Sequence, residues 1–295
     1  MNRLFVPFVA LLLTGSLLHG EDASYRNLDQ RECPILDTPY RTLSGLEVGY
    51  EFPASSDAAG WGDLSVYELD AWVRCLDWEN ESGGDLEIQL QANTMVLQTS
   101  KSSDGFSLTR AGPFLQWSQR FVDGYGMQVN ATPGLYSALQ SGMSGKDFSV
   151  PFGITGIKAF SPDFAVFAGV RVYPTFQQSL DPVLGIRWAD RDDVLVQLGY
   201  PESRFEYSLS TELRLIAGAR LWLWPDYGLG DDARERLRFE EGRAFAGVEW
   251  ACTEYTVLSL KCGYLFDRKI EFESESPDVR IDDAPFVAIG IGGRL

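Results

Sequence analysis

The sequence predicts an all-β protein, and three observations support this class. Apolar and polar residues alternate strictly in DLEIQLQANTMVLQ (residues 85–98), which is the period of a strand with one apolar and one polar face. Similar stretches recur along the chain and are rich in β-branched, aromatic and glycine residues. Helical spacing is nearly absent, and residues 230–242 form the single candidate for a short loop helix.

About fourteen stretches are typical of strands, and several are ten residues or longer. Strands of soluble proteins average about five or six residues, whereas a tilted membrane-spanning strand needs about nine to eleven. Because residues 194–200 and 204–209 could form one interrupted strand or a loop hairpin, twelve strands is an alternative count. The expected strands lie near residues 45–51, 63–76, 85–97, 106–117, 125–138, 148–160, 164–173, 182–188, 194–200, 204–209, 212–224, 236–251, 255–266 and 284–293.

The links between these stretches alternate in length. Residues 161–163 and 252–254 are short links, while 225–235 and the acidic stretch 267–283 are long ones. Outer-membrane barrels have long loops at one end and tight turns at the other, and only the short link at 201–203 departs from this rhythm. We expect residues 266–283 to be a hydrated external loop, with a calcium site there as a weaker alternative.

Alternation alone does not say which face looks inward. In a soluble sandwich the apolar face packs inward, and in a membrane barrel it meets lipid. Aromatic residues at expected strand ends favour the membrane, because aromatic girdles sit at membrane interfaces; they are Tyr173, Trp188, Trp222 and Trp224. The sequence therefore predicts a transmembrane antiparallel up-and-down β-barrel of about 12–14 strands, and a soluble exported β-sandwich or barrel that binds a ligand is the alternative.

The N-terminus has the layout of a secretory signal peptide. Arg3 is followed by an apolar run and then by small or polar residues, and that run is too short to span a membrane as a helix. We expect residues 1–20 to be the signal peptide, residues 21–44 a periplasmic lead-in and residues 45–295 the barrel, with both termini periplasmic. A buried N-terminal helix is the alternative.

Charge and histidine content exclude several functions. The formal net charge of −17 argues against binding nucleic acid, which needs a basic surface. His19 is the only histidine, so a chain without the signal peptide cannot form a Ser-His-Asp or Cys-His arrangement or an imidazole-ligated metal site. Acidic pairs such as Glu240–Glu241 are expected to be solvated loop charge rather than catalytic pairs. We predict no enzyme activity, no catalytic residue, no metal and no cofactor.

Four cysteines remain after the signal peptide, and they lack metal-ligand spacing. A disulfide between Cys33 and Cys75 is one interpretation in an exported protein. Free thiols acting as small apolar residues are the other. A hairpin turning near residues 253–254 would not place Cys252 opposite Cys262.

Polar residues on the inner parity of the strands are the candidate functional surface. In a water-filled barrel they would set ion preference, and in a plugged barrel they would form hydrogen bonds and ion pairs across the lumen; both alternatives are open. The candidate lumen-lining residues are Glu87, Gln89, Gln91, Asn93, Gln128, Asn130, Arg171, Arg187, Arg214, Arg220 and Glu249.

The stretch PVLGIRWADRDDVLVQLGYPESRFEYSLSTELRLIAGA (residues 182–219) resembles a family of uncharacterised bacterial proteins predicted to be outer-membrane β-barrels. The matching positions are Pro182, Gly185, Trp188, Gly199, Pro201, Tyr207 and Gly218. The resemblance implies an outer-membrane location, with membrane lipid and the barrel-assembly machinery as partners, and it supplies no activity or solute. The chain departs from outer-membrane barrels in general at its end, where Leu295 replaces the usual terminal aromatic residue.

Overall fold

The protein is a closed antiparallel β-barrel of 14 strands in the computed structural model. The structure describes residues 42–57, 62–79, 83–101, 106–138, 147–174, 179–190, 193–223, 227–228, 236–273 and 278–294. Within these ranges the 3₁₀ turn η1 (Val122–Gly124) is the one complete helical element, and Asp147 also has 3₁₀ conformation. None of the described residues belongs to a helix long and apolar enough to cross a membrane.

Eleven of the barrel's strands run without a break; β11 and β12 are the shortest of these and β15 is the longest. They are β1 (Thr42–Ser55), β2 (Asp63–Glu79), β3 (Gly84–Thr99), β4 (Phe106–Arg120), β9 (Phe164–Tyr173), β10 (Ser179–Asp190), β11 (Val194–Tyr200), β12 (Glu202–Ser208), β13 (Leu213–Leu223), β15 (Arg236–Thr253) and β16 (Thr256–Phe272).

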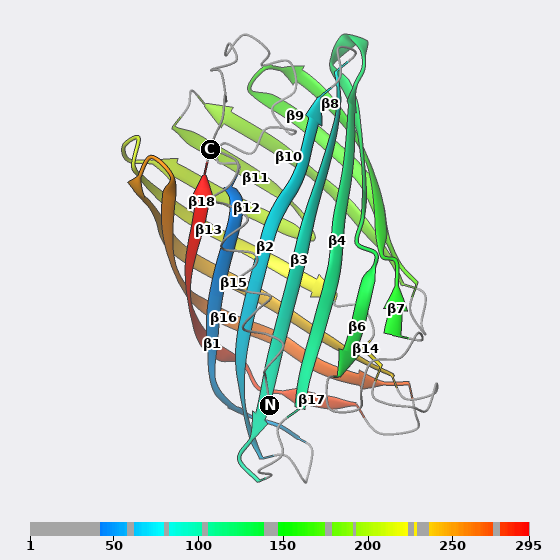
Figure 1. The fold of residues 1–295 in the computed structure, drawn as a ribbon, viewed down its shortest axis with the longest axis vertical. Helices are drawn as coiled ribbons and strands as arrows, with labels where there is room; N and C mark the ends of the chain where they lie inside the picture. Colours follow the sequence, from blue (N-terminus) through cyan, green and yellow to red (C-terminus); the bar gives the residue numbers. More distant parts are fainter. Residues whose placement is uncertain are drawn as a thin grey trace.

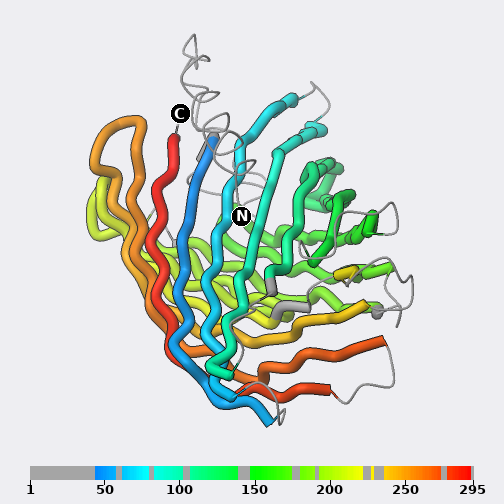
Figure 2. Tube along the Cα trace, turned by 60° about the horizontal axis from the view of Figure 1, so that its bottom comes forward, coloured from blue at the N-terminus to red at the C-terminus, as the bar shows by residue number. Residues whose placement is uncertain are grey.

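Three further strands of the barrel are interrupted. They are β5 with β6 (Tyr125–Ala131 and Gly134–Ala138), β7 with β8 (Phe148–Ser149 and Phe152–Ser161), and β17 with β18 (Val279–Ile281 and Ala284–Arg294). The two-residue segment β14 (Tyr227–Gly228) pairs with β15 and touches β6 through one parallel bridge. The ring closes where β1 pairs with β18 on one side and with β2 on the other (Figures 1 and 2).

The structure confirms the count of fourteen strands and corrects two local expectations. The alternative count of twelve is wrong, because β11 pairs with β10 and β12, and β12 pairs in turn with β13. The helix expected at residues 230–242 is wrong for residues 236–242, which begin β15, and residues 230–235 lie outside the described part.

The polar parity of the strands faces inward and the apolar parity faces outward. On β3, Leu90 is 40 % exposed, whereas Asn93, three positions further along and on the opposite face, is completely buried. The same contrast recurs around the ring, with Leu260 and Ile289 exposed on β16 and β18. The soluble-sandwich alternative, which would turn the apolar parity inward, is therefore wrong.

The connections distinguish the two ends of the barrel. The short-turn end holds the start of β1, the end of β18 and tight links such as residues 162–163 and 254–255. The long-loop end holds the connections at residues 139–147 and 224–235, in the second of which β14 lies. The expected exception is confirmed, because Pro201 alone links β11 to β12 at the long-loop end.

Exposed aromatic side chains form two belts on the outer face. The short-turn belt consists of Trp78, Phe121, Tyr125, Phe160, Trp188, Tyr207, Trp250 and Tyr255. The long-loop belt consists of Phe52, Tyr67, Phe152 and Tyr264. Along a strand, eleven positions separate Tyr67 from Trp78 and nine separate Tyr255 from Tyr264, which matches the roughly nine to eleven residues of a tilted membrane-spanning strand.

The aromatic residues expected at the membrane interface are only partly found there. Trp188 belongs to the short-turn belt. Tyr173 does not lie on the outer face, because it lines a cavity inside the barrel. Trp224 and the side chain of Trp222 lie outside the described part.

The inner face becomes apolar at the long-loop end and forms a packed core there. On β3 the change occurs after Asn93, where Met95 and Leu97 are fully buried. Tyr136 of β6 and Tyr227 of β14 meet edge to face with ring centroids 6.2 Å apart. We call this group the mouth core; it comprises Ala54, Leu64, Val66, Met95, Leu97, Leu108, Tyr136, Ala138, Tyr227, Leu237, Phe239, Ile270, Val279, Ile281 and Ala284.

The mouth core corrects the expectation for residues 266–283. Much of this stretch is strand rather than hydrated loop, since β16 continues to Phe272 and β17 pairs with it. Its apolar residues Ile270, Val279 and Ile281 are buried in the mouth core. Among the described charged residues of this stretch, Lys269 Nζ lies 2.5 Å from Glu271 and 3.0 Å from Asp278, whereas Arg268 is buried.

Candidate functional site in the barrel lumen

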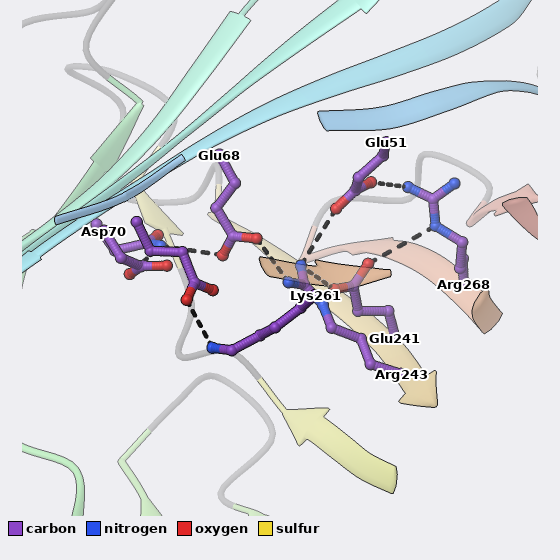
Figure 3. A network of polar contacts seen from close by, with 9 residues as sticks. Glu51, Glu68, Asp70, Glu241, Arg243, Lys261 and Arg268 are labelled. Atoms are coloured by element: carbon purple, nitrogen blue, oxygen red, sulfur yellow. Dashed lines mark hydrogen bonds and ion pairs between the residues drawn. The ribbon is translucent and has the colours of Figure 1, made fainter. Parts of the chain in front are cut away.

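A network of charged side chains lies in the lumen toward its long-loop end (Figure 3). The central network consists of Glu51, Glu68, Glu241, Arg243 and Arg268, which come from β1, β2, β15 and β16. These strands bring charges from residues 51 to 268 together because the closed ring turns all of their polar faces to one interior. Each of the three carboxylates is at most 5 % exposed.

Arg243 is the hub of the central network. Its guanidinium lies 2.7 Å from Glu68, 2.5 Å from Glu241 and 3.2 Å from Glu51. Arg268 pairs with Glu51 and lies 3.7 Å from Glu241. Burying charges is unfavourable unless they are paired and hydrogen-bonded, so the five groups depend on one another.

Polar contacts extend the central network along β1, β2 and β3. The amide of Asn93 donates to Glu68 at 3.1 Å and to Asp70 at 2.7 Å. Lys261 on β16 donates to Glu47 on β1 at 2.6 Å. This side of the lumen is therefore filled by side chains rather than open.

Two smaller polar groups lie elsewhere on the inner face. Near the short-turn end, Arg214 pairs with Glu206 and Glu249, and it ties β13 to both of its neighbours. Along β3, Arg74 donates to Glu87 at 2.8 Å, Gln89 donates to the same carboxylate, and Gln91 donates to Gln89 at 3.2 Å. The last member of this ladder is Arg110 of β4, which donates to Gln91 at 3.3 Å.

A cavity of about 330 Å³ lies on the other side of the lumen. β4, β5, β9 and β13 supply most of its polar lining, and the cavity reaches the long-loop ends of β8 and β9 at Phe152 and Val172. Its charged and polar lining residues are Gln91, Arg110, Gln116, Gln128, Asn130, Thr132, Tyr136, Arg171, Tyr173 and Arg220. Such a space accommodates a small polar solute.

The eleven candidate residues share the inner face with the central network, as the strand register shows. Asn93 joins the central network, Arg214 pairs with Glu249, and Glu87, Gln89 and Gln91 form the ladder on β3. Gln91, Gln128, Asn130, Arg171 and Arg220 line the cavity. Arg187 is buried on β10, where it pairs in register with Ala165 and Gln197.

Sequence reasoning missed the central network. Glu241 was expected to be solvated loop charge, and this is wrong because it is 3 % exposed within β15. Arg268 fell in the stretch expected to be an external loop, and Glu51 stands at the very end of an expected strand. The one local signal for this group was Arg243, a basic residue at the start of the otherwise mostly apolar, strand-like stretch RAFAGVEW.

The remaining predictions about metal and thiols have separate outcomes. Among the described residues no cluster of His, Cys, Asp or Glu could hold a metal ion. Cys252 and Cys262 carry free thiols, and Cys262 faces Ala246 rather than Cys252, as expected. Cys33 lies outside the described part, so its pairing with Cys75 stays a prediction.

The chain is similar to several solved structures at low sequence identity. No family model and no curated protein matches the chain. It is similar in structure to the beta domain of a Bordetella autotransporter, with 13% identity, a TM-score of 0.40 and coverage of 86% of this chain and 100% of that one. It is also similar to an outer membrane channel from Pseudomonas putida F1, with 12% identity, a TM-score of 0.47 and coverage of 87% and 97%. A third match is the translocator domain of an autotransporter from Neisseria meningitidis, with 11% identity, a TM-score of 0.39 and coverage of 89% and 91%.

Proposed function

We propose that the chain is an outer-membrane β-barrel that acts as a narrow passive channel for small polar solutes. The observation that carries the membrane location is the outer face, where apolar side chains such as Leu260 lie between the two aromatic belts. Lipid-facing bands of transmembrane barrels have this composition and height. The exported route through the predicted signal peptide (residues 1–20) and insertion by the assembly machinery belong to the same proposal.

The interior supports a restricted channel rather than an open pore. The central network fills the side of the lumen lined by β1, β2, β15 and β16, and the mouth core packs the long-loop end. The cavity on the side of β4, β5, β9 and β13 leaves space for a solute. We therefore expect transport along this second side, with a conductance well below that of a water-filled barrel of equal strand number.

A closed structural barrel is the second candidate, and the completeness of the mouth core favours it. Tyr136 and Tyr227 are both at most 1 % exposed, and they lie between the lumen and the long-loop end. In this case the acidic loops at that end would form the functional surface, and the side chains in the lumen would only stabilise the barrel.

Two measurements on one preparation test the proposal. Detergent-dependent extraction from membranes, with a gel mobility that changes on boiling, is expected of a membrane barrel, and a soluble periplasmic protein without this shift would overturn the location. Planar-bilayer recordings then separate the two roles. Small discrete conductance steps support the channel, and a reconstituted, heat-modifiable barrel that gives none is a structural barrel.

A further inference from the structure

The cavity in the lumen has a charge opposite to that of the protein. Three arginines line it, namely Arg110, Arg171 and Arg220. Among the described residues that line it, none is Asp or Glu. The chain as a whole has a formal net charge of −17, so this concentration of guanidinium groups does not follow from composition.

The three arginines come from separate strands and line one cavity. Arg110 is on β4, Arg171 on β9 and Arg220 on β13. Like charges brought together repel. An anion between them would relieve this repulsion, and guanidinium groups bind carboxylates and phosphates through paired hydrogen bonds.

Carboxylates of the protein offset part of this charge from outside the cavity. Glu202 lies 3.6 Å from Arg220, and the side chains of both are about one-third exposed. Asp181 faces Arg171 in the β9–β10 register. An exposed ion pair such as Glu202–Arg220 is worth little, whereas Asp181 is 8 % exposed and offsets more of the charge of Arg171.

The remaining polar lining suits the same kind of solute. Gln128 and Asn130 of β5 and Tyr173 of β9 add amide and hydroxyl donors. Gly153 keeps the site open, because a Cβ there would lie 2.9 Å from Asn130 Oδ1 and 3.3 Å from the Arg171 side chain. The volume of about 330 Å³ fits a small solute and excludes a large one.

We propose that this cavity binds small anionic solutes that carry carboxylate or phosphate groups, and that it makes the barrel anion-selective. The inference rests on the proposed passage through the lumen and names the class of solute that passes. Arg171 and Arg220 hold the anion by charge-assisted hydrogen bonds, and the amides of β5 bind its polar remainder.

Titration calorimetry of the folded barrel in detergent micelles tests the inference. The probes are succinate, its uncharged diamide succinamide, and 1,4-diaminobutane, a dication with the same four-carbon backbone. We expect saturable binding of succinate alone. The double variant Arg171→Gln/Arg220→Gln should weaken it about tenfold or more, since it removes two charged donors.

Two further variants separate a binding site from a folding defect. Arg280→Gln makes the same change at an exposed position on β17 and should leave binding unchanged. Arg171→Lys/Arg220→Lys keeps both charges and should recover most of the affinity. Heat-modifiable mobility shows that each variant is folded.

The outcomes are decisive for the inference and distinct from those for the channel. Absence of succinate binding by the folded barrel, equal binding of succinamide, or full binding by the folded double glutamine variant would each overturn the anion site. A barrel that binds succinate and does not conduct would keep the site and contradict the channel. A barrel that conducts without preference for anions would keep the channel and contradict the anion site.

Discussion

Arg243 of β15 and Glu68 of β2 form an ion pair of 2.7 Å that crosses the lumen. In the ring, β16, β18 and β1 lie between these two strands. The pair therefore connects distant parts of the wall, which backbone hydrogen bonds between neighbouring strands cannot do. It places the central network in the role of an internal brace.

Replacing Arg243 by alanine should destabilise the barrel strongly. The change would leave Glu51, Glu68 and Glu241 in the interior with Arg268 as the remaining cation of the central network. Removing one partner of a buried ion pair costs about 3–5 kcal/mol. Denaturant unfolding of the reconstituted protein measures the loss, and Arg280→Ala, at an exposed position, should cost about 0.5 kcal/mol or less. Equal losses in the two variants would contradict the brace.

Removing a balanced pair from the central network should widen the lumen. The double variant Glu68→Ala/Arg243→Ala removes one negative and one positive charge, so the net charge of the network is unchanged. Single-channel recordings should show a higher conductance than the unmodified barrel. The control Lys269→Ala/Asp278→Ala removes an equally balanced pair from the exposed surface at the long-loop end. A conductance that is the same in both double variants would show that the central network does not narrow the lumen.

The strands could be predicted from the sequence because their signal is local. Alternation in residues 85–98 gives both the strand and its two faces, and β3 indeed turns Glu87 and Asn93 to one side and Leu90 to the other. A count of about 12–14 strands followed from the same period, and the ambiguity lay in residues 194–200 and 204–209, which proved to be the two strands β11 and β12. Which side met lipid did not follow, because a sandwich produces the same alternation.

The central network and the mouth core could not be predicted, since both depend on distant contacts. Arg243 meets Glu51, which is 192 positions away, and no local pattern marks the two as partners. Glu241 lies beside a bulge between Glu240 and Gly242, where alternation fails and the sequence resembles a charged loop. Tyr227 belongs to a two-residue strand inside a long connection, which is too short to leave a periodic signal.

An arginine placed at mid-height on the outer face tests whether this face is embedded in lipid. Leu260 lies about midway between Tyr255 and Tyr264 on β16 and is 47 % exposed. In lipid, Leu260→Arg should cost about 2–4 kcal/mol, the value for a charge near the bilayer midplane. Val122, in the turn between β4 and β5, is 82 % exposed, and Val122→Arg should cost close to nothing. Unfolding in lipid vesicles measures both, and equal small costs would mean that the outer face is not embedded.

Truncating the mouth core should destabilise the long-loop end. Ile270 is fully buried, and Ile270→Ala should cost about 2–5 kcal/mol because it removes apolar contacts and leaves a cavity. Ile289 of β18 is 62 % exposed on the outer face, so the same change there should cost much less. Limited proteolysis should also cleave the long-loop end of the Ile270 variant faster. Similar unfolding midpoints for the two variants would argue against a packed mouth.

A pair of glycines on facing strands tests how tightly the wall is packed. A Cβ at Gly169 of β9 would lie 2.1 Å from the carbonyl oxygen of Ile154 and 2.7 Å from the Cα of Thr155, both backbone atoms that cannot turn aside. At Gly156 of β8 the nearest atom would be the carbonyl oxygen of Ala168, at an ordinary 3.7 Å. Gly169→Ala should therefore cost about 1–3 kcal/mol through overpacking, while Gly156→Ala should be neutral or slightly stabilising. Denaturant midpoints in detergent measure the difference, and a Gly169 variant as stable as its Gly156 counterpart would show that β8 and β9 are farther apart than the structure places them.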